Sequence, residues 1–425
     1  MKRKWSLTIM LGLLTTAQAQ TLQACWEAAE QNYPLIRQMD LITKTTDLTV
    51  ANIGKGWLPQ VQATAQATLQ SDVTAFPKEM QQLYQQVGLT MDGLKKDQYR
   101  VGVDISQTLF DGGAIKSQKA IARQQGQVEQ AQQDVSMYAV QRRVNEMYFS
   151  LLLLDEQIRL NHDLQQLLEG NEQKLASMYA HGTAAESDHL AVKAERLGAC
   201  QQLASLESQR HAVASMLSTF CGMSVDKVEK PSEKAATSLQ PAGQRPELTA
   251  IDAQLRLTEA KEQALAAGLL PRLSLFAQGF YGYPGYNMFE DMMRRRWNLN
   301  GMVGARLQWN IGALYTHRND KAKLQLQRAQ AENNREVFLF NNHLEQTQQD
   351  EQVERYRQLT ATDREIITLR QSVRKAAESK LQHGIIDVND LLKEINSEHA
   401  AQVQQSVHEI QMLKAMFDLK YTKGE

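Results

Sequence analysis

The sequence predicts a mainly α-helical protein with a small β part and an internal tandem repeat, and three observations support this fold class. Proline, which interrupts helices, is absent from two long stretches of the 425-residue chain. Four segments alternate between apolar and polar residues, as β-strands do. Several short phrases recur about 200 residues apart, which indicates a duplicated structural unit.

The prolines locate the long helices. None of the eight lies between Gly113 and Glu229, and none follows Pro284. Proline lacks a backbone donor and clashes with the preceding helical turn, so long helices are expected in these stretches. The run from Ala114 to Ala180 would extend about 100 Å as a helix. Towards the end of the chain, apolar residues recur at three- and four-residue steps, which predicts a coiled-coil seam.

The two halves of the chain carry the same pair of prolines. Pro34 and Pro59 lie 25 residues apart, as do Pro246 and Pro271, and the second pair follows the first after 212 residues. This period exceeds that of solenoid repeats, so each half is predicted to be a whole structural unit. The predicted first repeat, linker and second repeat are at 20–221, 222–245 and 246–425.

Each repeat is predicted to run in the same order: helix, β-hairpin, long helix, turn, helix. The hairpins are expected at about 58–110 and about 271–310, and the turns at 181–188 and 383–390. From Trp297 onward, the odd positions are mostly apolar and the even positions mostly polar or glycine. Such alternation with aromatic ends is typical of transmembrane β-strands. A half-buried strand of a soluble sheet has the same pattern, but four such segments in an exported chain favour the membrane.

The N-terminus predicts export from the cytoplasm. Residues 1–19 combine a basic start, a short apolar run and a small-residue cleavage site, which together form a secretory signal peptide. The phrase LQAC, at 22–25, faintly resembles a lipoprotein cleavage box. Polar residues separate Cys25 from the apolar run, so an apolar helix residue is the simpler interpretation. Three cysteines in the whole chain do not indicate a disulfide framework.

Composition and motifs argue against several classes of function. The net charge of -1 indicates no general attraction to nucleic acid. The P-loop and the motifs GxSxG, GxGxxG and HExxH are absent, so no enzyme activity is predicted. His181, His189 and His383 stand near acidic residues and could hold a metal in an oligomer. Solvated turn residues are the simpler interpretation, and neither a metal nor another cofactor is predicted.

Two similar phrases, YAHGTAAESDHL and LQHGIIDVNDLL, each join two helical runs through His-Gly. Gly182 and Gly384 fit the position after a helix that requires a positive φ angle. A capping box for the following helix is predicted at Thr183–Glu186, with an approximate counterpart at Asp387–Asp390. Both phrases are therefore predicted to be tight turns between antiparallel helices.

Several short phrases follow one another along the chain: the opening TLQACWEAAEQNYPLI, the LPQV and LPRL that lead into the hairpins, the LFDGG at the return to helix, and the two His-Gly turns. Taken in order, these phrases make the chain similar to the TolC family of outer-membrane efflux channels. None of them is specific alone. Their order, their repetition and the signal peptide together make a strong match over the whole mature chain.

The resemblance implies a homotrimer in the outer membrane of a Gram-negative bacterium, in contact with its lipid. Four transmembrane β-strands per chain would close a twelve-stranded barrel, and the long helices would form a coiled-coil barrel across the periplasm. A periplasmic membrane-fusion adaptor and an inner-membrane pump of the RND or ABC type are the implied partners. The expected function is passive export of small molecules (drugs, toxic compounds or metal ions) or secreted polypeptides. A periplasmic coiled-coil scaffold or adaptor without a pore is the alternative, which would account for the helices but not for the strands.

The resemblance also puts the two His-Gly turns at the periplasmic tip, where family members carry acidic residues that narrow the entrance. Asp188 and Asp390 match those positions. Lys393 stands where well-known members have a second carboxylate, and Leu381 and Ile386 stand where they have a locking tyrosine and a locking arginine. The expected turn and constriction residues are His181, Gly182, Glu186, Asp188, His383, Gly384, Asp387, Asp390 and Lys393.

Overall fold

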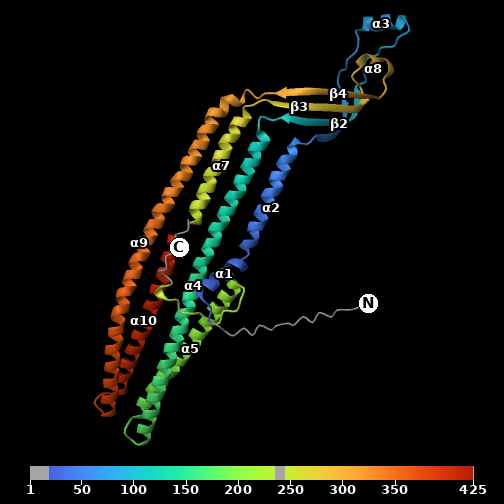
Figure 1. Ribbon diagram of the computed structural model, residues 1–425. Coiled ribbons are helices and arrows are strands. Elements are labelled where there is room, and N and C mark those ends of the chain that lie inside the picture. Colours follow the sequence, from blue (N-terminus) through green and yellow to red (C-terminus); the bar gives the residue numbers. More distant parts are fainter. Residues whose placement is uncertain (1–18, 235–244, 425) are drawn as a thin grey trace, which may run out of the picture. The chain divides into compact units, whose positions relative to one another are not determined.

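The structure is a computed structural model that describes residues 19–234 and 245–424 (Figure 1). The predicted signal peptide, apart from Ala19, and residues 235–244 of the predicted linker lie outside this range. The described chain forms two compact units. The helical unit contains the described residues of 1–40, 131–250 and 334–425, and the sheet unit contains 41–130 and 251–333. Each unit takes segments from both predicted repeats, so the repeat boundaries stay a prediction.

The elements alternate as the sequence indicates, with the long helix of each half between a β-hairpin and a tight turn. In the first half they are α1 (Leu22–Asn32), α2 (Leu35–Gly54), η1 (Lys55–Trp57), β1 (Gln60–Leu69), α3 (Lys78–Gln86), β2 (Asp97–Phe110), α4 (Ala114–Ala180) and α5 (Glu186–Cys221). In the second half they are α7 (Pro246–Gly268), β3 (Arg272–Tyr283), α8 (Met288–Arg294), β4 (Asn298–Gln308), α9 (Ala313–Gln382) and α10 (Val388–Lys423). The long helix predicted from Ala114 to Ala180 is confirmed as α4.

The sheet unit is built on a four-stranded antiparallel sheet in the order β1-β2-β3-β4. Its register aligns apolar residues across all four strands, in the row Val61, Ile105, Ala277 and Val303. Side chains alternate between the two faces along a strand, so this row and the rows two residues away form one face. The neighbouring row, which begins at Gln62 and is polar on three of its four strands, lies on the other face.

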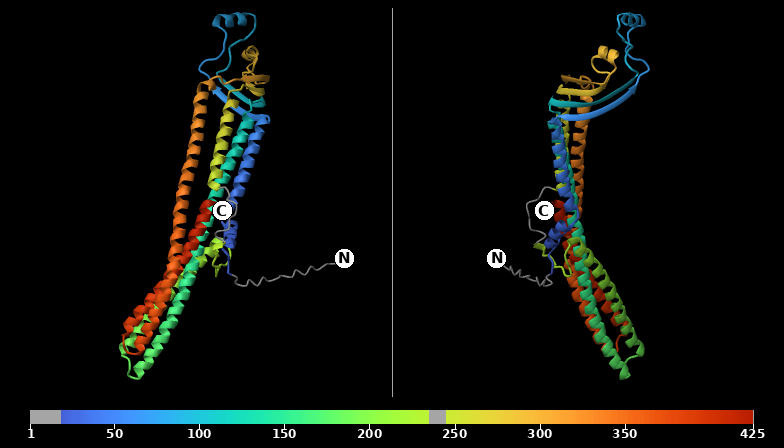
Figure 2. Two further views of the ribbon diagram at one scale, coloured as in Figure 1. Left: turned by 60° about the vertical axis from the view of Figure 1, so that its left-hand side comes forward. Right: turned by 90° about the vertical axis from the view of Figure 1, so that its right-hand side faces the viewer.

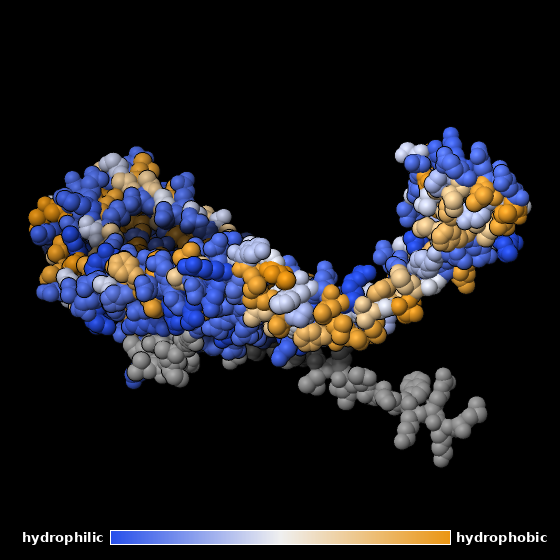
Figure 3. Space-filling view, turned by 90° about the horizontal axis from the view of Figure 1, so that it is seen from above, coloured by the Kyte–Doolittle hydropathy of each residue, from blue (hydrophilic) through white to orange (hydrophobic). Residues whose placement is uncertain are grey.

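The apolar face of the sheet is left uncovered by the described residues of the chain. Val303 is 82% exposed, and Val61, Leu69, Leu299 and Leu307 are exposed as well. In the space-filling view of Figure 3, apolar residues gather over the strands. The alternation predicted from the sequence is confirmed, and it produces a continuous apolar surface that has no partner among the described residues.

The helical unit consists mainly of two antiparallel helical hairpins, α4–α5 and α9–α10 (Figure 2). A central cluster joins them around Phe149 and Phe417, whose ring centroids lie 5.7 Å apart. A second cluster, here called the turn cluster, lies near the two His-Gly turns and includes Leu168 of α4, Val192 of α5 and Leu391 of α10. No helix in the described part of the chain combines the length and the apolar character that a membrane span requires.

Candidate functional site

The first predicted site is the turn between α4 and α5. Gly182 has a φ angle of 75°, and its N–H donates to the carbonyl of Tyr179 at 2.9 Å. Thr183 donates to the carbonyl of Met178 from its N–H at 2.8 Å and from its hydroxyl at 3.0 Å. These bonds satisfy carbonyls that the end of a helix otherwise leaves unpaired. The glycine therefore has the conformation that the sequence predicts.

The helix after this turn is capped differently from the prediction. The N-cap of α5 is Ala185, and the carboxylate of Asp188 accepts the N–H of Ala185 at 3.4 Å. Alanine has no side-chain acceptor, so only one half of a capping box is present. The capping box predicted at Thr183–Glu186 is therefore wrong, because the Thr183 hydroxyl bonds back to the end of α4 instead.

The second turn joins α9 to α10 through the same backbone. Gly384 has a φ angle of 69°, and the N–H of Ile385 donates to the carbonyl of Lys380 at 2.9 Å. The N-cap of α10 is Asp387, whose carboxylate accepts the N–H of Asp390 at 2.9 Å. The predicted pairing of Asp387 with Asp390 is confirmed for this half of a capping box. The side chain of Asp390 itself is exposed.

The two turn histidines make the same contact. Nδ1 of His181 lies 2.7 Å from the carbonyl oxygen of Ser177, and Nδ1 of His383 lies 2.7 Å from that of Ser379. A carbonyl oxygen only accepts, so Nδ1 carries the proton in both rings, and each imidazole helps to close its long helix. In the part of the chain that the structure describes, no group of three or more His, Cys, Asp or Glu side chains could hold a metal ion.

Apolar side chains support both turns from within the helical unit. Leu381 and Ile386, like Ala184 of the first turn, pack against the turn cluster. Leu391 is fully buried in that cluster, whereas Leu190, at nearly the same place in the first phrase, is 51% exposed. The second turn is therefore anchored in the apolar core more firmly than the first.

Ion pairs join the two helices of each hairpin at equivalent positions but with opposite polarity. Glu172 on α4 pairs with Arg196 on α5 at 2.5 Å. In the second hairpin, 202 residues later, Arg374 on α9 pairs with Glu398 on α10. Burial lowers the pKa of Arg374, but its bonds to Glu398 and Glu378 outweigh this effect, so that pKa is raised. The charges in the two hairpins are thus reversed at matching places.

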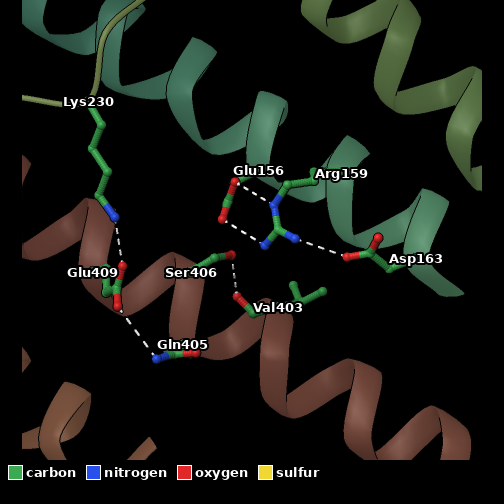
Figure 4. Close-up of polar contacts among 8 residues, drawn as sticks. All are labelled: Glu156, Arg159, Asp163, Lys230, Val403, Gln405, Ser406 and Glu409. Atoms are coloured by element: carbon green, nitrogen blue, oxygen red, sulfur yellow. Dashed lines mark hydrogen bonds and ion pairs between the residues drawn. The ribbon is translucent and has the colours of Figure 1, made fainter. Parts of the chain in front are cut away.

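Polar contacts also occupy the facing sides of α4 and α10 (Figure 4). Lys230, which follows α5, reaches Glu409 of α10 at 2.7 Å and so links the two hairpins. On α4, Arg159 bridges Glu156 and Asp163, each at 2.9 Å. The bond from Arg159 lowers the pKa of Glu156, although partial burial opposes it. Of these contacts, Lys230–Glu409 joins two segments of the helical unit, whereas the bonds of Arg159 lie within α4.

Comparison with known proteins shows what the chain is similar to. Residues 25–222, just under half of the chain, match the outer membrane efflux protein family. No curated protein matches the chain in sequence. Channels of this family are trimers that work with adaptors and pumps in tripartite systems.

Solved channel structures share the fold of this efflux protein. CusC matches with a TM-score of 0.69 at 13% identity, over 95% of this chain and 92% of CusC. The outer-membrane channel CmeC of Campylobacter jejuni matches with a TM-score of 0.67 at 11% identity, over 95% and 85% of the two chains. VceC, an outer membrane protein of Vibrio cholerae, gives a TM-score of 0.66 at 14% identity, over 95% and 96%. At these identities the likeness concerns the fold alone.

The resemblance inferred from the sequence phrases is therefore confirmed, and with it outer-membrane efflux as the function. The alternative of a scaffold without a pore does not account for the family match. The ion pairs within the hairpins were missed at the sequence level, although a signal existed. Opposite charges stand at 172 and 374, and at 196 and 398, which is the same 202-residue offset that relates the two His-Gly phrases.

The structure also locates the remaining predicted site residues of this efflux protein. Glu186 is an exposed side chain on the first turn of α5, and Lys393 is an exposed side chain on the second turn of α10. His189 lies in the helical hairpin, with Nε2 3.9 Å from the carboxylate of Glu172. The candidate residues thus divide into three kinds: those that shape the turns, those that cap the helices, and exposed charges.

Proposed function

We propose that three copies of this efflux protein assemble into a passive export channel through the outer membrane. The observation that carries the proposal is the four-stranded sheet, with its exposed apolar face and its two edge strands, β1 and β4. In lipid, the free backbone groups of edge strands must find partners, so such a sheet has to join others. Four strands are fewer than the eight of the smallest single-chain barrels, and three copies would close a barrel of twelve.

Aromatic residues at both ends of the apolar face support contact with outer-membrane lipid. At one end, the ring of Trp297 lies 6.1 Å from that of Tyr99 and 5.4 Å from that of Tyr281. At the other end, Trp57 and Trp309 are exposed. Tryptophan and tyrosine gather at the two interfaces of a membrane, because their rings are apolar while their polar atoms remain hydrated.

The two His-Gly turns are proposed to form the periplasmic entrance, with Asp188 and Asp390 as its constriction. In a trimer, six carboxylates would then surround the mouth, together with the nearby Glu186 and Asp387. Lys393 lies one helical turn beyond Asp390 and would partly neutralise it. Carboxylates that line a narrow water-filled pore attract cations and repel anions.

The closed entrance is proposed to be held by apolar packing. Leu381 and Ile386 contact the turn cluster, in which Leu391 is fully buried. They stand where well-known members of the family carry a locking tyrosine and a locking arginine. Opening the entrance would therefore expose apolar surface here, instead of breaking a polar lock.

The proposed partners are a periplasmic membrane-fusion adaptor and an inner-membrane pump of the RND or ABC type. The channel would be a passive conduit without enzyme activity, and the pump would select the cargo, which is a small molecule or a secreted polypeptide. Pull-down of the native inner-membrane partner with this efflux protein, followed by mass spectrometry, tests this part of the proposal. Recovery of no pump and no adaptor would contradict it.

The assembly is tested by mass measurement in detergent and by recording in planar bilayers. A trimer that forms cation-selective pores of low conductance, blocked by divalent cations from the periplasmic side, is expected. Asp390→Ala should weaken the block and the selectivity, and Lys393→Ala should strengthen the block, because each removes one charge from the mouth. Asn389→Ala, at a neighbouring exposed position, is the control and should behave as the parent protein. A monodisperse monomer that needs no detergent would exclude the channel, and unchanged recordings of both charge variants would exclude the constriction.

A further inference from the structure

Two of the three cysteines meet in the interior of the helical unit. Cys25, on α1, is fully buried, and Cys221, the last residue of α5, is 3% exposed. Sγ of Cys221 lies 3.5 Å from the carbonyl oxygen of Cys25, and the two thiols hydrogen-bond each other. The residues are 196 positions apart in the sequence, so only the packing of α1 on α5 brings them together.

Contacts on both sides of the thiols fix how α1 lies on the end of α5. Asn32, the last residue of α1, donates from Nδ2 to the carbonyls of Thr219 and Phe220 at 3.1 and 3.2 Å. Before α1, the hydroxyl of Tyr148 lies 2.9 Å from the carbonyl oxygen of Gln20. The residue pair therefore occupies a defined place in the central cluster and does not depend on a loose helix end.

We propose that Cys25 and Cys221 form a disulfide bond in the exported protein. An outer-membrane protein folds outside the cytoplasm, where disulfides form and persist. Each cysteine loses its S–H bond and one S–S bond forms. The two electrons and two protons pass to the disulfide of a periplasmic thiol–disulfide oxidoreductase, which leaves as a dithiol. The exchange takes place during folding, because in the packed protein both thiols are out of reach of a second protein.

The two buried thiols ionise differently in the folded protein. Their mutual hydrogen bond lowers the pKa of Cys221 and, together with burial, raises the pKa of Cys25. Thiolates, and not thiols, are the nucleophiles of disulfide exchange.

Cys200 provides an internal reference. It lies 21 residues before Cys221 on the same helix, which separates the two by about 30 Å along α5. Its Sγ is 3.5 Å from Oε1 of Gln165, on α4. Cys200 therefore cannot reach either partner and is expected to stay a free thiol.

The experiment counts free thiols in protein that is exported to the outer membrane and purified without reductant. After denaturation in a thiol-blocking reagent, one modified cysteine per chain is expected, at Cys200, and three after prior reduction. Tryptic digestion should join peptide 211–227 to a peptide that ends at Arg37. Three free thiols without reduction, a lipid on Cys25, or a disulfide between two copies of the chain would each overturn the proposal.

Variants show whether the bond contributes to stability. A reductant should lower the apparent melting temperature of the parent protein and of Cys200→Ser by several degrees, because the bond closes a long loop in the unfolded chain. Cys25→Ser and Cys221→Ser should melt at a temperature that the reductant does not change. An equal response of all four proteins to the reductant would contradict the proposal.

Discussion

The two helical hairpins, α4–α5 and α9–α10, share a backbone and differ in side-chain chemistry. Both turns place a glycine at positive φ, and both use a histidine Nδ1–H to close the long helix. The helices that follow the turns, α5 and α10, are capped from opposite sides. Asp188 lies within α5 and accepts the N–H of the N-cap residue, whereas Asp387 is itself the N-cap of α10 and accepts an N–H from within that helix. A tight turn requires glycine at one place, but a carboxylate can cap the next helix from either side.

The reversed polarity of the two ion pairs bears on which helices pair with each other. If α10 packed on α4 in the register of α5, Glu172 would face Glu398. If α5 packed on α9 in the register of α10, Arg374 would face Arg196. Like charges at such a distance repel, most strongly where water is excluded. The reversed polarity therefore opposes exchange between two hairpins whose backbones are otherwise alike.

The largest expected difference between the hairpins concerns these ion pairs. Arg374→Gln leaves Glu398 buried without its partner and should lower the free energy of unfolding by about 3–5 kcal/mol. At the equivalent position, Glu172→Gln leaves Arg196, which is more exposed and can be hydrated, so a much smaller loss is expected. Urea unfolding followed by circular dichroism measures both. Equal losses would mean that the two ion pairs contribute equally to stability despite their different burial.

The next difference concerns the apolar anchoring of the turns. Leu391→Ala creates a cavity in the turn cluster and should destabilise the helical unit by about 2–5 kcal/mol. Leu190→Ala, in the first phrase, changes an exposed side chain and should remain within about 0.5 kcal/mol of the parent protein. Thermal unfolding of the two variants side by side decides it, and a large effect of Leu190→Ala would show that the first turn is anchored as well.

A smaller effect, equal in both hairpins, is expected from the turn glycines. A Cβ at Gly182 or Gly384 meets open space, so alanine there is opposed only by the positive φ angle, which costs about 1–2 kcal/mol. Gly198→Ala, within α5 and also facing open space, is the matched control and should stabilise by up to about 1 kcal/mol. If all three variants gain stability, the left-handed turns are not required.

The smallest expected effect is the pH dependence that His399 of the second hairpin contributes. Burial lowers the pKa of His399 on α10, and the nearby Asp163 of α4 opposes this only in part. As the pH falls below the usual histidine value of about 6.5, the unfolded chain binds a proton here that the folded protein resists, so stability is lost towards acid pH. His399→Gln should therefore lose less stability than the parent between about pH 7 and about pH 5, by under about 1 kcal/mol.

A matched variant separates this effect from other titrations. His211→Gln removes an exposed histidine of α5 and should leave the pH dependence of unfolding as it is in the parent protein. The measurement is the urea midpoint of the three proteins across the same pH range. Identical curves for His399→Gln and the parent would mean that the interior of the helical unit accepts the proton without penalty.

Much of the fold was predictable, because its signals are local. The absence of proline and the helical composition predicted α4 to the residue, and period-two alternation predicted the apolar face of the sheet. The N-cap of α5 was not predictable in the same way. The side chains of Thr183 and Asp188 could each cap α5. The Thr183 hydroxyl bonds to the end of α4 instead, and Asp188 accepts the N–H of Ala185.

The sequence by itself determined which segments are helix, strand and turn, and which family the phrases resemble, because periodicity and the φ angle of a glycine depend on a few neighbouring residues. Only the tertiary structure decided that Leu391 is buried and Leu190 exposed, that Arg374 meets Glu398, and that Cys25 meets Cys221. Those partners stand on different helices, and their distances follow from how the helices pack and align. A shift of one residue along a helix turns a side chain by about 100°, so no local rule can supply the partner.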